Sequence, residues 1–395
     1  MGTHKEKPST ILALAGARAI PPVLIVLYHY CEGHHYTGVR LLDLVAARGY
    51  LWVEFFFALS GFILTHVYAS RIKELWTRSG YFGFLKSRLI RLYPLHLFML
   101  LALLALMLSV RAAADFGGYV SIYDRPTYHP NMTPEGFFAS LFLVHGWNTL
   151  STLTWNGASW FVSVEFALCL LFPFFVWFQH GRAWRGVALV AAGAAGLAAL
   201  AFTSAHGLDL TFNKGVLRGL ADFAIGVGLA RLFAEFRHAR IPVWVHSVLQ
   251  IVLVAQMLLV FTNSGWSHTP RDLFTAFSMQ ALIPALAFDK GMIADFLKFD
   301  WMQRLGEWSY GIYIGQTFWL QYMRVIEFRF YPAPETPVFG TPFADVAFWA
   351  EPILLMVICT LWGGLLATKI ETPAAKWLRQ QLDRPRPAAP TSGIA

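Results

Sequence analysis

Long apolar stretches separated by short polar segments run along most of the chain. About ten of these stretches reach the roughly 17–25 residues that a membrane-spanning helix requires. They cover residues 11–31, 50–70, 92–110, 160–178, 187–204, 215–233, 243–262, 272–288, 305–327 and 346–368. A further apolar stretch, 137–147, is too short to cross a bilayer, and we expect it to lie at the surface or to re-enter. The pattern predicts an all-α polytopic membrane protein, a single bundle of about ten transmembrane helices.

The composition is that of a membrane protein. Of 395 residues, 56% are hydrophobic and 14% are charged, whereas a soluble domain carries about 25% charged residues. Since no repeat and no long Gly/Ser linker divides the chain, we expect one transmembrane domain over 10–379. Within it, residues 111–159 are expected to form an extracytoplasmic lid or docking segment. The ends, 1–9 and 380–395, are predicted to be disordered.

The net charge of +8 is distributed unevenly along the chain. Lys and Arg concentrate in alternate connections, after the second, fourth, sixth and tenth apolar stretches. The positive-inside rule makes these connections cytoplasmic, and an even number of spans then makes both termini cytoplasmic. We therefore predict a multi-pass protein of the cytoplasmic (inner) membrane. The basic excess reflects topology and at most an anionic ligand, and it does not indicate a nucleic-acid partner.

Two ionisable residues, Arg18 and His29, interrupt the first apolar stretch. On an unbroken helix, eleven steps of about 100° bring both side chains to within about 20° of one face, ~16 Å apart along the axis. Ionisable groups are costly in hydrocarbon, so this pair is a candidate functional site. The alternative is that Arg18 snorkels to the interface and His29 caps the far end of the helix.

Carboxylates in neighbouring stretches are candidate partners for the histidine. Glu54 lies near the outer end of the second stretch, at a depth similar to that of His29. A carboxylate beside an imidazole would fix its tautomer and raise its basicity, as a general base requires. Alternatively, Glu54 pairs with an arginine or faces outer water. Arg218 and Asp222, four residues apart, are expected to form a structural pair.

The segment from His29 to His35 is rich in potential metal ligands, but it lacks the ligand spacing of zinc sites. We therefore expect no metal. The three cysteines form no CxxC pair and are expected to pack in the core.

A basic element precedes the third span. Arg88 and Arg91 are three residues apart and share a helix face, with Lys86 nearby. Two guanidinium groups in this arrangement could bind phosphate in bidentate fashion. Basic residues at this position also serve as ordinary topology signals, so both interpretations stay open.

Polar residues gather near the outer mouth of the expected bundle. The fourth stretch contributes Asn156, Trp160, Ser163 and Glu165, with Glu165 inside the membrane. The ninth stretch places Tyr310, Tyr313 and Gln316 at helical spacing, a pattern that packing alone also produces.

Six motifs in order resemble the acyltransferase-3 family of integral-membrane acyltransferases. They are GARAIPPVLIVLYH, GYLWVEFFFALSGF, RLIRLYP, ASWFVSVEFALCLLFP, LGEWSYGIYIGQ and KIETPAAKW, and the resemblance covers about residues 10–380. Arg18 and His29 match the family's Arg-x10-His helix, while Arg88 and Arg91 match its Arg-x-x-Arg element. Glu54 stands where the family usually has aspartate. Gln316 stands where a histidine is usual, and Phe161 where a serine often follows the tryptophan.

The resemblance implies an O-acyltransferase that moves an acyl group from cytoplasmic acyl-CoA to a hydroxyl of a glycan or lipid-linked acceptor. Acetyl is the first expectation for the acyl group and succinyl the second, and acyl-CoA is a co-substrate, with no permanently bound cofactor. The expected catalytic residues are His29, Glu54 and Glu165. The expected donor-binding residues are Arg18, Arg88, Arg91 and Lys86. The expected acceptor-binding residues are Trp160, Asn156, Ser163, Tyr310, Tyr313 and Gln316.

The donor is expected to reach His29 through a tunnel in the bundle, with Gly61 in its wall. Either direct attack by the acceptor or an acyl-histidine intermediate fits this reading. The alternative from another class is a transporter or flippase that uses the intramembrane charges as a substrate or proton path. Matched halves with broken helices, which are typical of such transporters, are not evident in the sequence.

Overall fold

The computed structural model describes residues 10–34, 37, 39–124, 132–264, 271–330 and 344–382, and these residues form helices and no strand. The all-α class is therefore confirmed. The expected disordered N-terminal segment 1–9 lies outside the described residues, and so does the tail after Leu382. Helix α16 (Thr372–Leu382) continues past the expected domain boundary at 379.

Seven helical segments of the described chain are long and apolar enough to cross a membrane. They are Leu12–Glu32, Arg40–Tyr68, Arg78–Gly117, Gly157–Gln179, Ala183–Thr203, Val243–Phe261 and Ala350–Leu382. The remaining three expected stretches are also helical, as α10 (Gly215–Phe236), α12 (Asp272–Ala287) and α14 (Asp300–Phe330). Helix α10 carries charged residues such as Arg218 and Asp222 and is therefore less apolar than the seven, and α12 is shorter, with only 16 residues. The expected count of ten is therefore approximate.

The first spanning segment is not one continuous helix. It consists of α1 (Leu12–Ala17) and α2 (Ile20–His34), with Arg18 at the C-cap of α1. Pro21 and Pro22 have no backbone N–H, so the carbonyls four residues earlier lose their helical donors. We expected Arg18 and His29 on one face because we assumed an unbroken helix. The break at Arg18 shows that this assumption does not hold.

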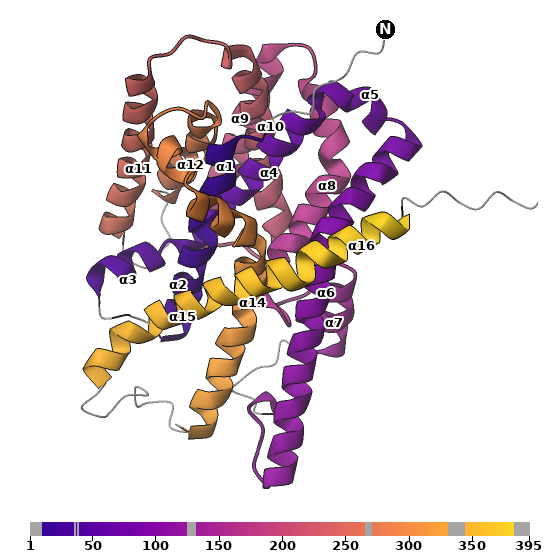
Figure 1. Ribbon diagram of the computed structural model, residues 1–395, viewed down its shortest axis with the longest axis vertical. Helices are drawn as coiled ribbons and strands as arrows, with labels where there is room; N and C mark the ends of the chain where they lie inside the picture. Colours follow the sequence, from indigo (N-terminus) through magenta and orange to yellow (C-terminus); the bar gives the residue numbers. More distant parts are fainter. Residues whose placement is uncertain are drawn as a thin grey trace, which may run out of the picture.

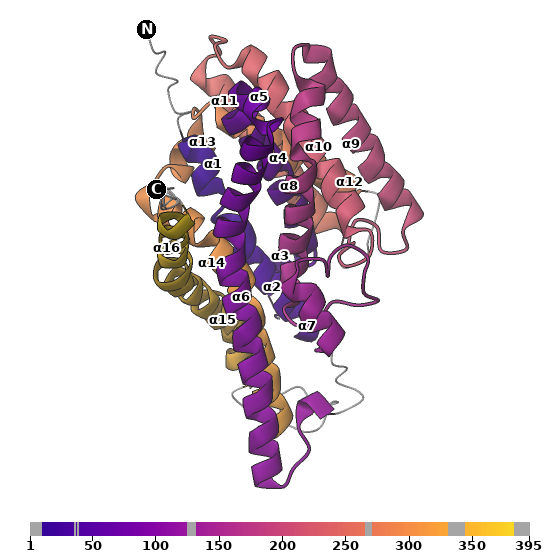
Figure 2. The same cartoon turned by 90° about the vertical axis from the view of Figure 1, so that its right-hand side faces the viewer.

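The longest element, α6 (Arg78–Gly117), has 40 residues and runs along most of the height of the molecule (Figures 1 and 2). Its first part carries Lys86, Arg88 and Arg91, so the basic element before the third span is helical. The second half of α6 and the end of α14 extend beyond the other helices at one end of the molecule. The apolar stretch at 137–147 forms the short α7 (Pro134–Leu141) followed by turns.

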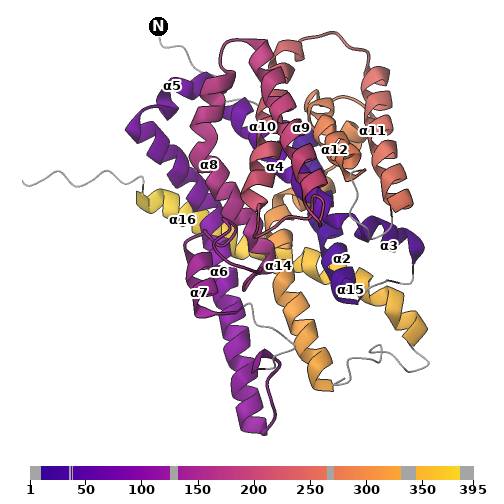
Figure 3. The ribbon, with the colours of Figure 1, turned by 180° about the vertical axis from the view of Figure 1, so that it is seen from behind.

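Two groups of helices lie on opposite sides of α6. On one side, α15 (Ala344–Leu366), the π-helix η5 (Ala367–Glu371) and α16 cross obliquely over α14 and α6 (Figures 1 and 2). On the other side lie α8 (Trp160–Gln179), α9 (Ala183–Thr203) and α10, which Figure 3 shows from behind. The remaining helices are α3 (Arg40–Ala46), α4 (Trp52–Tyr68), α5 (Ile72–Leu75), α11 (Val243–Ser264) and α13 (Met292–Leu297).

Helices α4 and α10 approach closely at reciprocal glycines. A Cβ atom on Gly61 would lie 2.4 Å from the Phe223 carbonyl oxygen, and one on Gly226 would lie 1.9 Å from that of Ala58. Small residues permit this backbone contact, as is typical of membrane helices. Gly61 is thus a helix-packing residue, and the expectation that it lines a tunnel wall is wrong.

Candidate active site

Charged residues from four separate elements interact inside the bundle. Arg18, at the break in the first span, is close enough to interact electrostatically with Arg91 of α6, Glu165 of α8 and Glu371 of η5. Its Nη2 atom also donates a hydrogen bond of 3.1 Å to the hydroxyl of Ser309 on α14. We call Arg18, Arg88, Arg91, Glu165 and Glu371 the central charge cluster.

Glu165 is a buried carboxylate whose hydrogen bonding is incomplete. One of its oxygens accepts from the Ser60 hydroxyl of α4, while Oε2 is buried without a hydrogen-bond partner. It interacts electrostatically with Arg88, Arg91 and Arg18. An unpaired buried carboxylate oxygen is costly, so this atom is available to a hydrogen-bond donor of a bound molecule.

Arg88 and Arg91 of α6 both interact electrostatically with Glu165, which agrees with the shared helix face that their three-residue spacing predicts. The Arg88 guanidinium lies 5.9 Å from the ring centroid of Phe84, and its Nε is buried without a partner. Close by, the Tyr310 hydroxyl donates to the Leu92 carbonyl at 2.6 Å and fastens α14 to α6. The two arginines are thus supported by a defined contact between helices.

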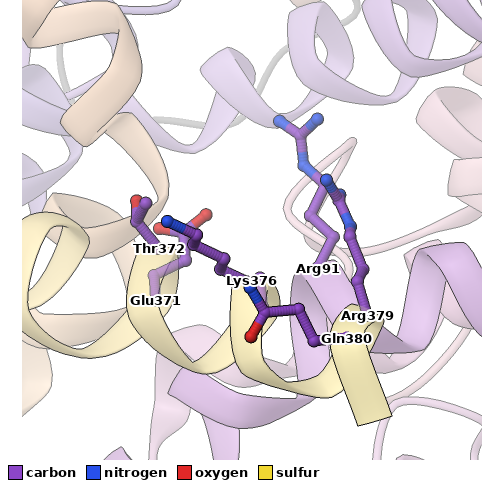
Figure 4. Close-up of a pocket in the computed structure, with 7 residues that line it drawn as sticks. Arg91, Glu371, Thr372, Lys376, Arg379 and Gln380 are labelled. Carbon is purple, nitrogen blue, oxygen red and sulfur yellow. The ribbon is translucent and has the colours of Figure 1, made fainter. Parts of the chain in front are cut away.

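A cavity of about 400 Å³ opens beside Arg91 (Figure 4). Its lining comes from α6, η5 and α16: Arg91, Glu371, Thr372, Ala375, Lys376, Arg379 and Gln380. Arg91 is accessible to solvent from this side. The carboxylate of Glu371 has one buried oxygen without a hydrogen-bond partner, like that of Glu165. Lys86, expected in the donor site, instead donates from Nζ to the Leu382 carbonyl at 3.1 Å.

His29 on α2 has a carboxylate partner, but it is neither Glu54 nor Glu165. Its Nδ1 lies 2.8 Å from Oε2 of Glu32, one helical turn later. Glu32 also accepts from the Tyr28 hydroxyl at 3.0 Å. His29 is 27% exposed, so the ring can meet a molecule from outside the bundle. With Glu32 accepting at Nδ1, the proton belongs on Nδ1 and the lone pair on Nε2.

Glu54 forms a fully buried ion pair with Arg218 of α10, with Nη2 2.5 Å from Oε2. The same guanidinium donates to the carbonyls of Tyr50 (2.7 Å) and Leu210 (2.9 Å). The expected contact between Glu54 and His29 is therefore wrong, and the alternative of an arginine partner is the one observed. Asp222 interacts electrostatically with Arg218, as expected, but its hydrogen bond comes from Gln280 at 2.7 Å.

The expected acceptor residues are buried, apart from the partly buried Tyr310, and are mostly engaged in packing. Trp160 lies beneath the Arg218 guanidinium at 5.8 Å, and Tyr313 packs on Phe161 with ring centroids 5.5 Å apart. Three side chains bind carbonyl oxygens: Asn156 that of Ile314, Ser163 that of Leu143, and Gln316 that of Tyr313. The structure brings none of these six residues to His29 through a described contact.

Four residues of the site had no catalytic or binding role assigned from sequence: Glu32, Ser60, Ser309 and Glu371. The spacing His-x-x-Glu, which places both side chains on one helix face, was a usable signal for Glu32. Glu371 belongs to the KIETP motif but had no assigned role. Ser60 and Ser309 sit in distant stretches, and only the packing of α4 and α14 brings them to Glu165 and Arg18.

Comparison with known proteins identifies the family to which the chain belongs. The acyltransferase-3 family model, described as an acyltransferase domain, matches residues 11–368. "Acyltransferase MdmB" of Streptomyces mycarofaciens is 25% identical over 405 residues, 96% of this chain and 94% of its own length. "Protein 2 in picA locus" of Rhizobium radiobacter is 31% identical over 167 residues, 42% of this chain and 78% of its own length. No solved structure matches the chain. Because the family model spans nearly the whole chain, the protein belongs to the acyltransferase-3 family of membrane acyltransferases.

Proposed function

We propose that the protein transfers an acyl group, acetyl first and succinyl second, from acyl-CoA to a hydroxyl of a glycan or lipid-linked acceptor. One observation carries the proposal: His29, oriented by Glu32 and partly exposed, shares a spanning segment with Arg18 of the central charge cluster. A general base and an anion-binding group are thus mounted on one element.

In this mechanism, His29 is the general base. Its Nε2 takes the proton of the acceptor hydroxyl while the hydroxyl oxygen attacks the thioester carbonyl carbon. When the C–S bond breaks, the CoA sulfur leaves as a thiolate and takes the proton from the imidazolium. Glu32 holds the ring and stabilises its positive charge through the 2.8 Å contact at Nδ1. This is the role for which we had expected Glu54 or Glu165.

The donor phosphates would bind near Arg88 and Arg91, because guanidinium groups form bidentate contacts with phosphate. Arg18 lies on the same spanning segment as His29 and interacts electrostatically with Arg91, so it would stabilise the donor partway along. Basic residues at the start of α6 support entry of the donor from the cytoplasm, with the protein in the inner membrane. The acceptor would approach His29 from the opposite side.

The test is acyl transfer in membranes that contain wild-type protein or the variant His29→Ala, supplied with radiolabelled acetyl-CoA. Loss of a general base lowers rates by about 10²–10⁴, so we expect that loss of label in glycan and lipid fractions. Glu32→Gln should lower the rate by about tenfold or more, because the tautomer is then no longer fixed. His180→Ala, which changes an exposed histidine at the end of α8, is the control.

Near-normal turnover in a well-folded His29→Ala protein would contradict the proposal. Uptake of a labelled substrate into vesicles without release of free CoA would favour a transporter instead.

A further inference from the structure

We propose that α16, the helix after the last span, forms one wall of the nucleotide-binding half of the donor site. In this arrangement Lys376 and Arg379 bind phosphate groups of the CoA nucleotide opposite Arg91. The inference rests on the proposed function, because it takes acyl-CoA as the donor. It assigns a binding role to a helix that sequence analysis placed at the edge of the domain.

The cavity-lining residues of α16 follow a helical spacing. Thr372, Ala375, Lys376 and Arg379 recur at intervals of three and four, so they share one face of the helix. That face meets Arg91 of α6 across the cavity of about 400 Å³. Pockets for small organic ligands start at roughly this size, and a nucleotide fits such a volume better than a whole acyl-CoA does.

The charge of the cavity favours a polyanion. Arg91, Lys376 and Arg379 are cations, and Glu371 is the one carboxylate among the described lining residues. The side chains of Arg91 and Arg379 extend in the same direction from α6 and α16 (Figure 4). Like charges that face one space repel unless an anion lies between them, and phosphate accepts bidentate contacts from arginine. The diphosphate and the 3′-phosphate of CoA supply such anions.

Glu371 adds a second, independent feature. It ends the π-helix η5, and π-helical turns occur often at functional sites. Its Oε2 atom is buried without a hydrogen-bond partner, although it interacts electrostatically with Arg91 and Arg18. A carboxylate here repels phosphate but accepts from N–H and O–H groups. The amides and hydroxyl of a pantetheine arm, which joins the nucleotide to the acyl group, offer these donors.

Lys86 holds α16 against α6. Its Nζ donates to the carbonyl of Leu382, the last residue of α16, at 3.1 Å. A cation at the C-terminal end of a helix is also favoured by the helix dipole. Lys86 is therefore a positioning residue for α16, and Lys376 and Arg379 take the direct role in binding that we had expected of Lys86.

The experiment compares three thioester donors by release of free thiol: acetyl-CoA, acetyl-dephospho-CoA, which lacks the 3′-phosphate, and S-acetylpantetheine, which lacks the nucleotide. In the Lys376→Ala/Arg379→Ala double variant, we expect KM for acetyl-CoA to rise roughly ten- to hundredfold. KM for S-acetylpantetheine should stay at the wild-type value, and kcat should stay within about twofold for both donors. Arg379→Glu should have a larger effect than Arg379→Ala.

Arg240→Ala, at an exposed arginine before α11, is the matched control for loss of a surface cation. If the double variant still transfers acetyl and keeps the wild-type KM for acetyl-CoA, the inference about α16 is overturned and the proposed function is not. An equal rise in KM for all three donors would also overturn it, because the nucleotide would then not be the group that is bound. If wild-type protein transfers neither acetyl nor succinyl from the corresponding CoA thioesters, the proposed function fails instead.

Discussion

Two of the charge groups inside the bundle differ in how completely their hydrogen bonds are satisfied. Arg218 and Glu54 form a closed set, since the guanidinium donates to both carboxylate oxygens and to the carbonyls of Tyr50 and Leu210. The central charge cluster is open. Glu165, Glu371 and Arg88 each keep a buried polar atom that has no hydrogen-bond partner.

This difference distinguishes a structural role for the Arg218–Glu54 pair from a binding role for the central charge cluster. A buried ion pair is tolerated when its geometry is good and its remaining hydrogen bonds are made, as in the Arg218–Glu54 pair. Polar atoms left unpaired inside a protein are costly and therefore uncommon, and they need an explanation. A bound ligand that completes their hydrogen bonds is such an explanation, which is why we assign substrate binding to the central charge cluster and not to the Arg218–Glu54 pair.

The largest expected effect comes from breaking the closed pair. Glu54→Gln leaves Arg218 buried with no carboxylate, and loss of one partner of a buried ion pair costs about 3–5 kcal/mol. Thermal unfolding in detergent should show a large fall in Tm, or the variant should fail to accumulate. Glu165→Gln is the matched change in the open cluster and should shift stability by less than about 1 kcal/mol while it lowers activity. Equal destabilisation by both changes would remove the distinction between the two groups.

The second-largest expected effect concerns Arg88 and Arg91, the two residues that α6 contributes to the central charge cluster. If Arg88 and Arg91 bind the donor phosphates as we propose, Arg88→Ala and Arg91→Ala each remove a charge-assisted hydrogen bond, which contributes about 1.5–3 kcal/mol. The donor KM should therefore rise roughly ten- to hundredfold, with kcat at saturating donor much less changed. Steady-state kinetics with acetyl-CoA measures both constants. If both variants keep the wild-type KM, these arginines act only as topology signals.

The smallest expected effect lies at the contact that holds Arg18. Ser309→Ala removes the hydroxyl that accepts from Nη2 at 3.1 Å. A single hydrogen bond contributes about 0.5–1.5 kcal/mol, so kcat/KM should fall by roughly two- to tenfold. Ser109→Ala, at a serine on α6 that bonds only to its own helix, should leave kcat/KM unchanged. Equal losses in the two variants would mean that the Ser309 contact has no role in transfer.

The sequence predicted the helices well because apolar length is a local property. All ten expected stretches are helical, and the short stretch at 137–147 contains only α7. Arg18, Arg91 and Glu165 interact in the structure, and each belongs to one of the motifs that resemble the family. The signal for the break at Arg18 was present in Pro21 and Pro22, yet we treated the first span as one helix.

Partners of the carboxylates were harder to predict because they depend on packing. Glu54 and Arg218 are 164 residues apart in sequence, and only the glycine contact between α4 and α10 places them together. Two residues at similar depth, such as Glu54 and His29, need not face each other. The true partner of His29 lay one turn away, where helical geometry alone would have found it.

The break in the first span has a consequence for the surroundings of its backbone. Pro21 and Pro22 leave the carbonyl oxygens of Ala17 and Arg18 without the N–H groups that an unbroken helix would supply. Lipid chains offer no donor, and irregular backbone at membrane depth is stable only where protein buries it or where water reaches it. Ala17 is only 6% exposed, so the packing of the surrounding helices keeps lipid chains away from the backbone at this break.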